Sequence, residues 1–229
     1  MPILIFVLIG VLIVFAIYVA YQTKKRRREA FFALGNKLGL RYDEGDPFNT
    51  VDLPFDLFQK GSRQGVENTL FGETGGMRVR LFDYYFVETS TNSNGTSSST
   101  TYPFSCALGE IDADCPHLVV EREGFLSSIA RGLGFHDIET ESEEFNKAFK
   151  ISCDDRRFAF AMLDQRMMAW LLDEGAVCQY ETMGPLVLCY IKRVKPEEYE
   201  NLLEVLRRFR AHVPDVVGSL YPRGKEAHA

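Results

Sequence analysis

The sequence lacks the motifs that mark nucleotide and metallopeptidase sites. Its 229 residues contain no P-loop, no GxGxxG and no HExxH, so nucleotide-dependent chemistry is disfavoured. The 9 prolines and 18 glycines follow no fixed period, which excludes a collagen-like fibre. Because 46% of the residues are hydrophobic and 25% are charged, the composition is that of a globular protein and excludes a long disordered chain.

Cysteine is too scattered to form a disulfide framework. The five cysteines are odd in number, widely spaced and without a CxxC pair: Cys106, Cys115, Cys153, Cys178 and Cys189. This usage agrees with a reducing compartment.

Charge is absent from the N-terminal part of the chain until Lys24. Residues 3–21 are mostly Ile, Leu, Val and Phe, and as a helix they would cover roughly 28 Å, close to the ~30 Å hydrocarbon thickness of a bilayer. A buried core helix would show a polar face, and a cleaved signal peptide would carry its basic residues before the apolar run. We therefore predict a retained transmembrane anchor in residues 1–23, which holds the protein in the membrane through residues 3–21.

Five basic residues follow the apolar run directly and indicate its orientation: Lys24, Lys25, Arg26, Arg27 and Arg28. Basic clusters next to a span stay on the cytoplasmic side, so we predict a single-pass protein whose remaining chain is cytoplasmic. The same side chains would also attract anionic lipid headgroups, although a topology signal is sufficient to explain them.

The remainder of the chain is acidic. Residues 1–28 hold five basic and no acidic side chains, which leaves 21 Lys and Arg against 32 Asp and Glu, a charge of −11. A nucleic-acid partner needs a basic surface, and the only dense one lies next to the predicted membrane anchor. We therefore expect no nucleic-acid binding.

The composition divides the rest of the chain into a basic juxtamembrane segment, 24–45, a cytoplasmic domain, 46–221, and a short tail, 222–229. Apolar residues from Arg28 to Leu40 recur at helical spacing and predict a short amphipathic helix that Gly39 stops. This helix could lie along the headgroups or pack on the domain.

Alternating apolar residues predict a mainly antiparallel sheet in the domain. Strands are expected at five segments: 68–72, 77–87, 102–111, 117–121 and 149–153. Residues 89–101 are almost all Ser, Thr and Asn, which predicts a mobile loop at a hairpin tip, and 124–134 could hold a short helix. A last hairpin over 177–194 would place Cys178 opposite Cys189, either as a redox pair or as two small buried side chains.

Capping residues predict the helices of the C-terminal half. Asp155 or Asp154 caps one helix, which runs through Leu163, and Asp164 caps another over Gln165 to Glu174. The Met, Leu and Trp stripe of the second helix fits the core better than an exposed binding face. Pro196 starts a last helix, which ends at Pro214. The predicted fold class is α+β, with a single N-terminal transmembrane helix and one cytoplasmic domain in which C-terminal helices pack a largely antiparallel sheet.

The residues that could carry chemistry gather between Glu110 and His117. Glu110, Asp112 and Asp114 alternate with apolar residues, so a strand would place the three carboxylates on one face, where they could bind a hard cation. The segment lacks the spacing of a calcium loop and could equally be a solvated edge. Cys115 and His117 suggest a nucleophile and its base, but a proline separates them and no geometry is assured. We therefore predict no catalytic, cofactor or metal site.

Several fragments stand out together: Gly72 with Phe82-Asp83-Tyr84-Tyr85, Asp137-Ile138 with Glu141-Ser142-Glu143-Glu144-Phe145-Asn146, and Arg166-Met167-Met168 with Trp170-Leu171-Leu172. With them the chain resembles an uncharacterised family of bacterial membrane-anchored proteins, over roughly Phe31 to Pro214. The resemblance implies a bacterial inner-membrane location and brings no catalytic residues with it.

The sequence thus favours a membrane-anchored cytoplasmic interaction module, without an evident catalytic site, that holds a protein partner at the inner membrane. A domain that binds lipid or another small apolar ligand is the alternative, because of the basic flank and the many phenylalanines. An enzyme that uses Asp112, Asp114, Cys115 or His117 is the least favoured hypothesis.

Overall fold

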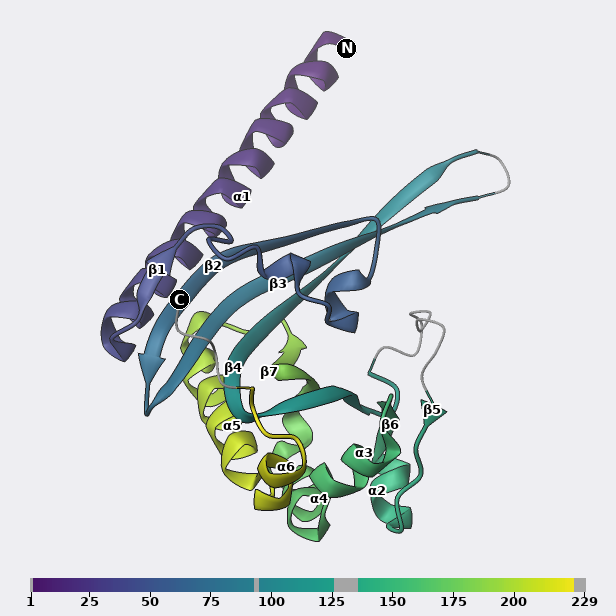
Figure 1. The fold of residues 1–229 in the computed structure, drawn as a ribbon. Helices are drawn as coiled ribbons and strands as arrows, with labels where there is room; N and C mark the ends of the chain where they lie inside the picture. The colour runs from purple at the N-terminus through teal and green to yellow at the C-terminus, as the bar shows by residue number, and fades with distance from the viewer. Residues whose placement is uncertain (1, 93–94, 126–135, 225–229) are drawn as a thin grey trace.

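One long helix leads into an antiparallel sheet that later helices cover (Figure 1). The computed structural model describes residues 2–92, 95–125 and 136–224. Over these residues the fold is α+β as predicted, with a long apolar N-terminal helix, a largely antiparallel sheet and helices in the C-terminal half.

The first helix, α1 (Pro2–Leu38), joins two segments that the sequence analysis treats separately. Its N-terminal part is exposed, and it is long and apolar enough to cross a membrane. The predicted juxtamembrane helix is the C-terminal part of α1 and not a helix of its own, because the Lys and Arg residues between them are good helix formers. Gly39, with a φ of 69°, ends α1 in the left-handed conformation that is common after a helix.

The sheet has seven strands in the part of the chain that the structure describes, and every pair is antiparallel. Their order is β1-β2-β3-β4-β6-β5, and β7 pairs with β4. The strands are β1 (Arg41–Asp43), β2 (Arg63–Thr74), β3 (Met77–Thr91), β4 (Ser97–Arg122), β5 (His136–Asp137), β6 (Phe149–Cys153) and β7 (Gln179–Lys192).

The predicted hairpin of β2 and β3 is confirmed, and it is longer than expected. Its turn is Gly75-Gly76, whose φ angles of 59° and 69° are those that a tight hairpin turn requires and that glycine adopts without strain. Both faces of β3 are buried from Leu81 to Tyr84, in agreement with the apolar residues on both faces there. The sheet is therefore covered on both sides.

The prediction of a mobile loop at 89–101 is wrong for most of this range. β3 continues to Thr91 and β4 begins at Ser97, so a two-stranded ribbon projects from the sheet (Figure 1). Hydroxyl groups pair across it: Thr89 Oγ1 lies 3.2 Å from Ser99 Oγ, and Thr91 Oγ1 lies 2.9 Å from Ser97 Oγ. A Ser/Thr/Asn composition buries little apolar area, but the register set in the buried half of the hairpin extends outward through these cross-strand pairs and orders the segment.

β4 is one continuous strand where two were predicted, 102–111 and 117–121. Its register against β7 shifts on both sides of Cys115, which pairs with Gly184. Gly184 has a φ of 55°, so the pair of strands bends at this point without the chain reversing.

The predicted hairpin at 177–194 is therefore wrong, because both halves of this segment form β7 and pair with β4. Cys189 lies opposite Ala107, not opposite Cys178. All five cysteines are buried and free, which agrees with their interpretation as small apolar side chains.

Two helices of the C-terminal half begin at predicted caps, Asp155 and Asp164. Pro196 starts a 3₁₀ turn that leads into the helix predicted to be the last, and a further helix follows Pro214. The Asp155 carboxylate accepts the N–H groups of Arg157 and Phe158, and that of Asp164 accepts the N–H of Met167 at 2.8 Å. The helices are α2 (Glu143–Ala148), α3 (Arg156–Met162), α4 (Gln165–Leu172), α5 (Tyr199–His212) and α6 (Asp215–Leu220), and the 3₁₀ helices are η1 (Thr50–Asp52), η2 (Asp56–Gln59), η3 (Gly175–Val177) and η4 (Pro196–Glu198). Most of the predicted helix at 124–134 and of the tail at 222–229 lies outside the described residues.

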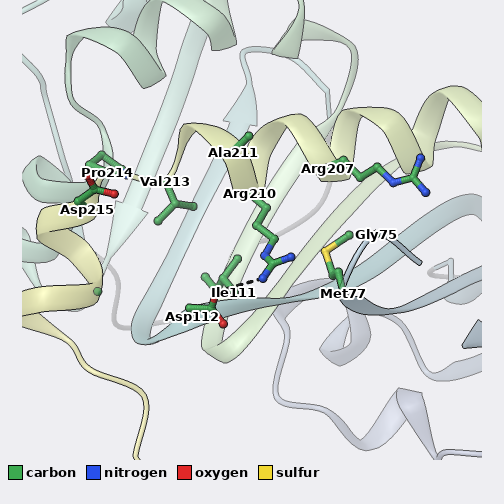
Figure 2. A pocket seen from close by; sticks show the side chains of 11 residues that line it. Gly75, Met77, Ile111, Asp112, Arg207, Arg210, Ala211, Val213, Pro214 and Asp215 are labelled. Atoms are coloured by element: carbon green, nitrogen blue, oxygen red, sulfur yellow. Dashed lines mark hydrogen bonds and ion pairs between the residues drawn. The ribbon is translucent and has the colours of Figure 1, made fainter. Parts of the chain in front are cut away.

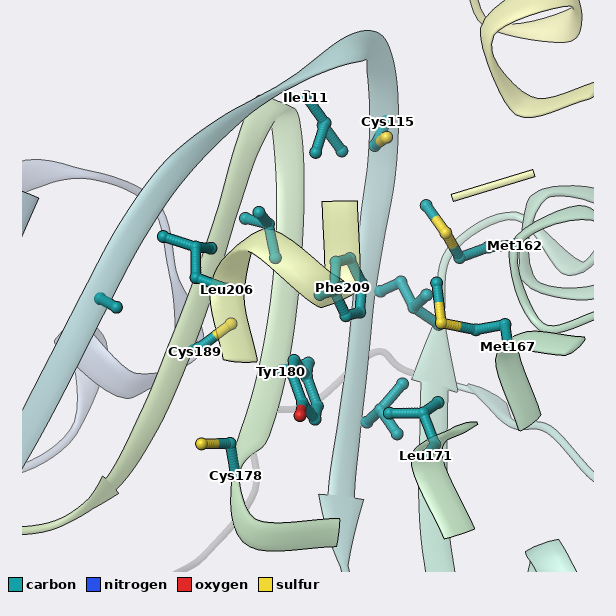
Figure 3. Close-up of a cluster of buried hydrophobic side chains, with 14 of the residues drawn as sticks. Ile111, Cys115, Met162, Met167, Leu171, Cys178, Tyr180, Cys189, Leu206 and Phe209 are labelled. Carbon is teal, nitrogen blue, oxygen red and sulfur yellow. The ribbon is translucent and has the colours of Figure 1, made fainter. Parts of the chain in front are cut away.

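Two apolar layers lie on the two sides of the sheet. The larger one joins the sheet to the helices and contains Met167 and Leu171 of α4 (Figure 3). Trp170 belongs to the same layer, so the prediction that the stripe of α4 is core is confirmed. The smaller one is rich in aromatic rings of β3, β4 and β7, and the segment around η2 covers it with Phe55, Leu57 and other side chains. Apolar side chains therefore cover both faces of the sheet.

Candidate functional site

The C-terminal part of α1 packs directly against the domain. Phe31 and Leu34 of α1 are 0% and 6% exposed and belong to the larger apolar layer. Burial of side chains of this size stabilises a contact by roughly 1.5–3 kcal/mol each. The helix that is long and apolar enough to cross a membrane therefore continues into the core of the domain.

An arginine locks the same helix face to the sheet. The Arg27 guanidinium donates two hydrogen bonds of 2.6 Å to the Asp83 carboxylate of β3, and a third of 2.9 Å to the carbonyl of Val194. Asp83 is fully buried. A two-pronged pair of this kind is strong and directional.

Three further donors complete the environment of Asp83. Asn68 donates at 2.9 Å and the Tyr199 hydroxyl at 2.8 Å, while the Arg193 guanidinium lies 3.4 Å away. Asn68 has a φ of 56° at a β-bulge of β2, which aims its side chain inward. Burial, and then the neighbouring Asp83 charge, raise the pKa of Tyr199 well above its ordinary value, so the hydroxyl stays a donor.

Other residues of the basic cluster also form ion pairs with the domain. Lys24 pairs with Glu67 at 3.1 Å and Arg28 pairs with Glu44 at 2.9 Å, both across to the domain. The role of Arg27 was not predicted, although the sequence carries a signal for it. Arg27 precedes Phe31 by four residues and Leu34 by seven, which places it on the apolar face of α1.

A second polar cluster is buried beneath η2. The Nε2 atom of His117 in β4 lies 2.6 Å from Oε1 of Glu181 in β7. The same carboxylate accepts the backbone N–H groups of Asp56 and Leu57, where η2 begins. The potential ligand atoms of Asp56, His117 and Glu181 lie within 4.8 Å of one another.

Charge in this cluster is only partly compensated. Burial raises the pKa of Glu181, and its hydrogen bonds with His117 and the Asp56 N–H offset this in part. For His117, burial alone would lower the pKa, but the hydrogen bond and charge of Glu181 raise it. Close by, Lys60 pairs with Glu121 at 3.7 Å.

A groove of about 570 Å³ lies between α5, α6 and the turn of β2 and β3 (Figure 2). Met77 and Ile111 are among the apolar residues that line it, and Arg207 and Arg210 contribute the positive charge. Arg210 pairs with Asp112 at 3.0 Å, and Arg207 donates to a threonine hydroxyl of β2. The groove has the volume of a small-molecule site, but both cations already have partners in the protein.

The acidic residues singled out in the sequence do not form one site. Glu110 pairs with arginines at 2.8 and 3.0 Å, and Asp112 pairs with Arg210. His117 instead joins Glu181, a partner that the sequence analysis did not consider, because β4 and β7 are far apart in the chain. Burial, and then the charge of Asp114, raise the pKa of Cys115 to about 12, which disfavours the thiolate that a nucleophile needs.

Comparisons with known proteins give one informative likeness. No family model matches the chain, and no curated protein matches it. Among solved structures, the crystal structure of the mycobacterial trehalose monomycolate transport factor A, TtfA, matches with a TM-score of 0.62 at 11% identity, over 89% of this chain and 98% of that chain. The chain shares its fold with a mycobacterial transport factor. At this identity the likeness shows the fold alone.

Proposed function

We propose that this protein is a non-enzymatic, single-pass module of a bacterial inner membrane, with its domain in the cytoplasm, that docks a second integral membrane protein. The buried Arg27–Asp83 pair carries the proposal. A flexible linker would be enough to keep a domain near a membrane. A helix that enters the core and is locked there also sets the orientation of the domain, which matters when the partner is itself held in the bilayer.

The orientation of the chain rests on the basic residues next to the apolar run. Lys24, Arg27 and Arg28 pair with carboxylates of the domain. Lys25 pairs within α1, with Glu29 at 3.9 Å, and both Lys25 and Arg26 are exposed. These two side chains are the ones we expect to contact anionic headgroups.

The ribbon formed by β3 and β4 is the part of the domain best placed to meet such a partner. Figure 1 shows that it and the apolar end of α1 project from the same side of the molecule. Its described residues beyond Glu88 are exposed and carry hydroxyl and amide groups. Such a surface makes polar contacts and does not enter hydrocarbon unpaired.

Two further observations support a docking role. The crystal structure with a similar fold is that of a transport factor, and the resemblance in the sequence is to bacterial membrane-anchored proteins. In the described residues, the candidate nucleophile Cys115 is held as a thiol and the acidic residues Glu110 and Asp112 are paired with arginines.

The test is photo-cross-linking in native membranes, with a photoreactive amino acid in place of Ser98 on the ribbon or of Val216 on α6, which is 47% exposed. We expect one specific integral membrane partner from Ser98 and none from Val216. A short Gly/Ser linker inserted after Thr23 leaves the Arg27–Asp83 pair intact but frees the orientation of the domain, so it should abolish the cross-link. The same linker appended to the C-terminus is the control.

Two outcomes would contradict the proposal. If the variant with the linker after Thr23 cross-links as well as the control, orientation is irrelevant. If Ser98 yields no specific partner, the ribbon is not a docking surface.

The groove of α5 and α6 supports a second candidate, binding of a lipid or another amphipathic anion. Its apolar residues and two arginines suit an acyl chain and an acidic headgroup. Native mass spectrometry of the full-length protein from membranes tests it. A co-purifying lipid that is lost in the Ala211→Trp variant, in which an exposed residue of α5 that lines the groove is enlarged, would favour this candidate over docking.

A further inference from the structure

Asp56, His117 and Glu181 come from three separate segments and converge beneath η2. His117 lies in β4 and is 6% exposed, and Glu181 lies in β7 and is 0% exposed. Asp56 is the first residue of η2 and is partly exposed, so one side of the cluster is open. The sequence gives no hint of this convergence, because register between β4 and β7 brings it about.

The donor set is that of a divalent transition metal. One imidazole nitrogen and two carboxylate oxygens are the ligands that zinc-class ions accept, usually with water at a fourth position. All three ligand atoms lie within 4.8 Å of one another. Ligands of one ion at about 2.0–2.1 Å, in tetrahedral arrangement, lie about 3.3 Å apart. His117 Nε2 and Glu181 Oε1, now 2.6 Å apart, would need to separate by less than about 1 Å to take an ion in place of the shared proton.

The surroundings favour a positive charge at this point. Besides its own two carboxylates, the cluster has the negative charges of Asp154 and Glu121 nearby, and the positive charge of Lys60, which acts on Asp56 and pairs with Glu121 at 3.7 Å, offsets part of them. Buried carboxylates are unfavourable unless a cation or several donors compensate them. A divalent ion supplies more compensation than a single proton on His117.

Backbone groups also orient one of the ligands in advance. Glu181 accepts the N–H groups of Asp56 and Leu57, which fixes the plane of its carboxylate. Outer contacts of this kind orient metal ligands in proteins.

We propose that Asp56, His117 and Glu181 bind one divalent ion of the zinc class. The ion would tie η2 to β4 and β7, and so hold the segment that covers the smaller apolar layer of the sheet. This proposal is independent of the docking function.

The test uses the full-length protein in detergent, stripped with EDTA and titrated with Zn²⁺ and then with Co²⁺. We expect one equivalent of either ion to bind, a higher thermal midpoint with Zn²⁺, and the visible absorption of Co²⁺ with oxygen and nitrogen ligands. The Asp56→Asn variant keeps the backbone N–H that Glu181 accepts, so it should fold normally. It should bind Zn²⁺ at least about tenfold more weakly.

Asp154→Asn is the matched control. Asp154 is exposed, and its charge acts on His117. Its backbone N–H, which donates to the His117 carbonyl at 3.3 Å, is kept in the Asn variant, so this change should alter the affinity for Zn²⁺ much less. Three results would overturn the proposal: no saturable binding of either ion, equal affinity in wild type and Asp56→Asn, or a sulfur-to-cobalt charge-transfer band, which would place the ion on cysteine.

Discussion

Replacement of Arg27 by alanine tests whether the junction between anchor and domain is as firm as its contacts indicate. The change removes the two 2.6 Å hydrogen bonds to Asp83 and the one to Val194. It leaves a fully buried carboxylate with Asn68, Tyr199 and the more distant Arg193.

The neighbouring Arg28 is a matched control. It lies on the same helix and also pairs with a carboxylate, Glu44, at 2.9 Å, but the two side chains are 48% and 61% exposed. Loss of one partner from a buried pair costs about 3–5 kcal/mol, whereas an exposed pair contributes about 0–1 kcal/mol. Because three donors to Asp83 remain, we place Arg27→Ala at the lower end, about 3 kcal/mol, and Arg28→Ala below about 1 kcal/mol.

Urea unfolding of the full-length protein in detergent measures both values. Trp170 is the only tryptophan and is 6% exposed, so its fluorescence reports the unfolding of the core. The Asp83→Asn variant completes the comparison, since it removes the charge and keeps the shape. If Arg27→Ala costs no more than Arg28→Ala, the buried pair does not stabilise the junction, and the argument for a fixed orientation of the domain fails.

Three further predictions concern local structure. Gly61→Ala should lower stability by at least about 2 kcal/mol, because its φ is 77° and the new Cβ would lie 2.6 Å from a carbonyl oxygen. Gly124→Ala is the control and should cost only about 1 kcal/mol of backbone strain, because its φ is 80° but no atom lies within 4 Å of the new Cβ. Equal losses of stability in urea unfolding would refute the clash at Gly61. Asp164→Ala should lower stability by about 1 kcal/mol through the lost helix cap, while the Asn variant keeps the acceptor and should stay near wild type in the same assay. Cys178 and Cys189 should resist alkylation in the folded protein at pH 8, because burial raises the pKa of the Cys178 thiol to about 12; rapid labelling measured by mass spectrometry would contradict this.

The two polar clusters show how the chain handles buried charge. At the junction, Asp83 has a bidentate arginine and further donors, so its charge is compensated within the protein. Beneath η2, Glu181 has a histidine and backbone N–H groups, with additional carboxylates nearby. The first arrangement suits a permanent structural lock, and the second suits an exchangeable cation.

Local patterns predicted those parts of the fold that depend on residues close in sequence. Residues close in sequence determine three of these features: the helix caps at Asp155 and Asp164, the Gly75-Gly76 hairpin turn and the core stripe of α4. The errors arose where a partner far along the chain decided the outcome. The Ser/Thr ribbon is strand because its register is set inside the sheet, and 177–194 is one strand because β4 pairs with both halves of it.

The same division applies to function. By itself the sequence determined a helix that can cross a membrane, the basic residues after it and an α+β domain, because hydrophobic length, charge order and apolar periodicity are local properties of a chain. Only the tertiary structure decided that Arg27 reaches Asp83 and that His117 joins Glu181 under η2. Each of these contacts joins residues more than fifty positions apart, and such pairs meet only when strand register and helix packing bring their side chains into one buried space.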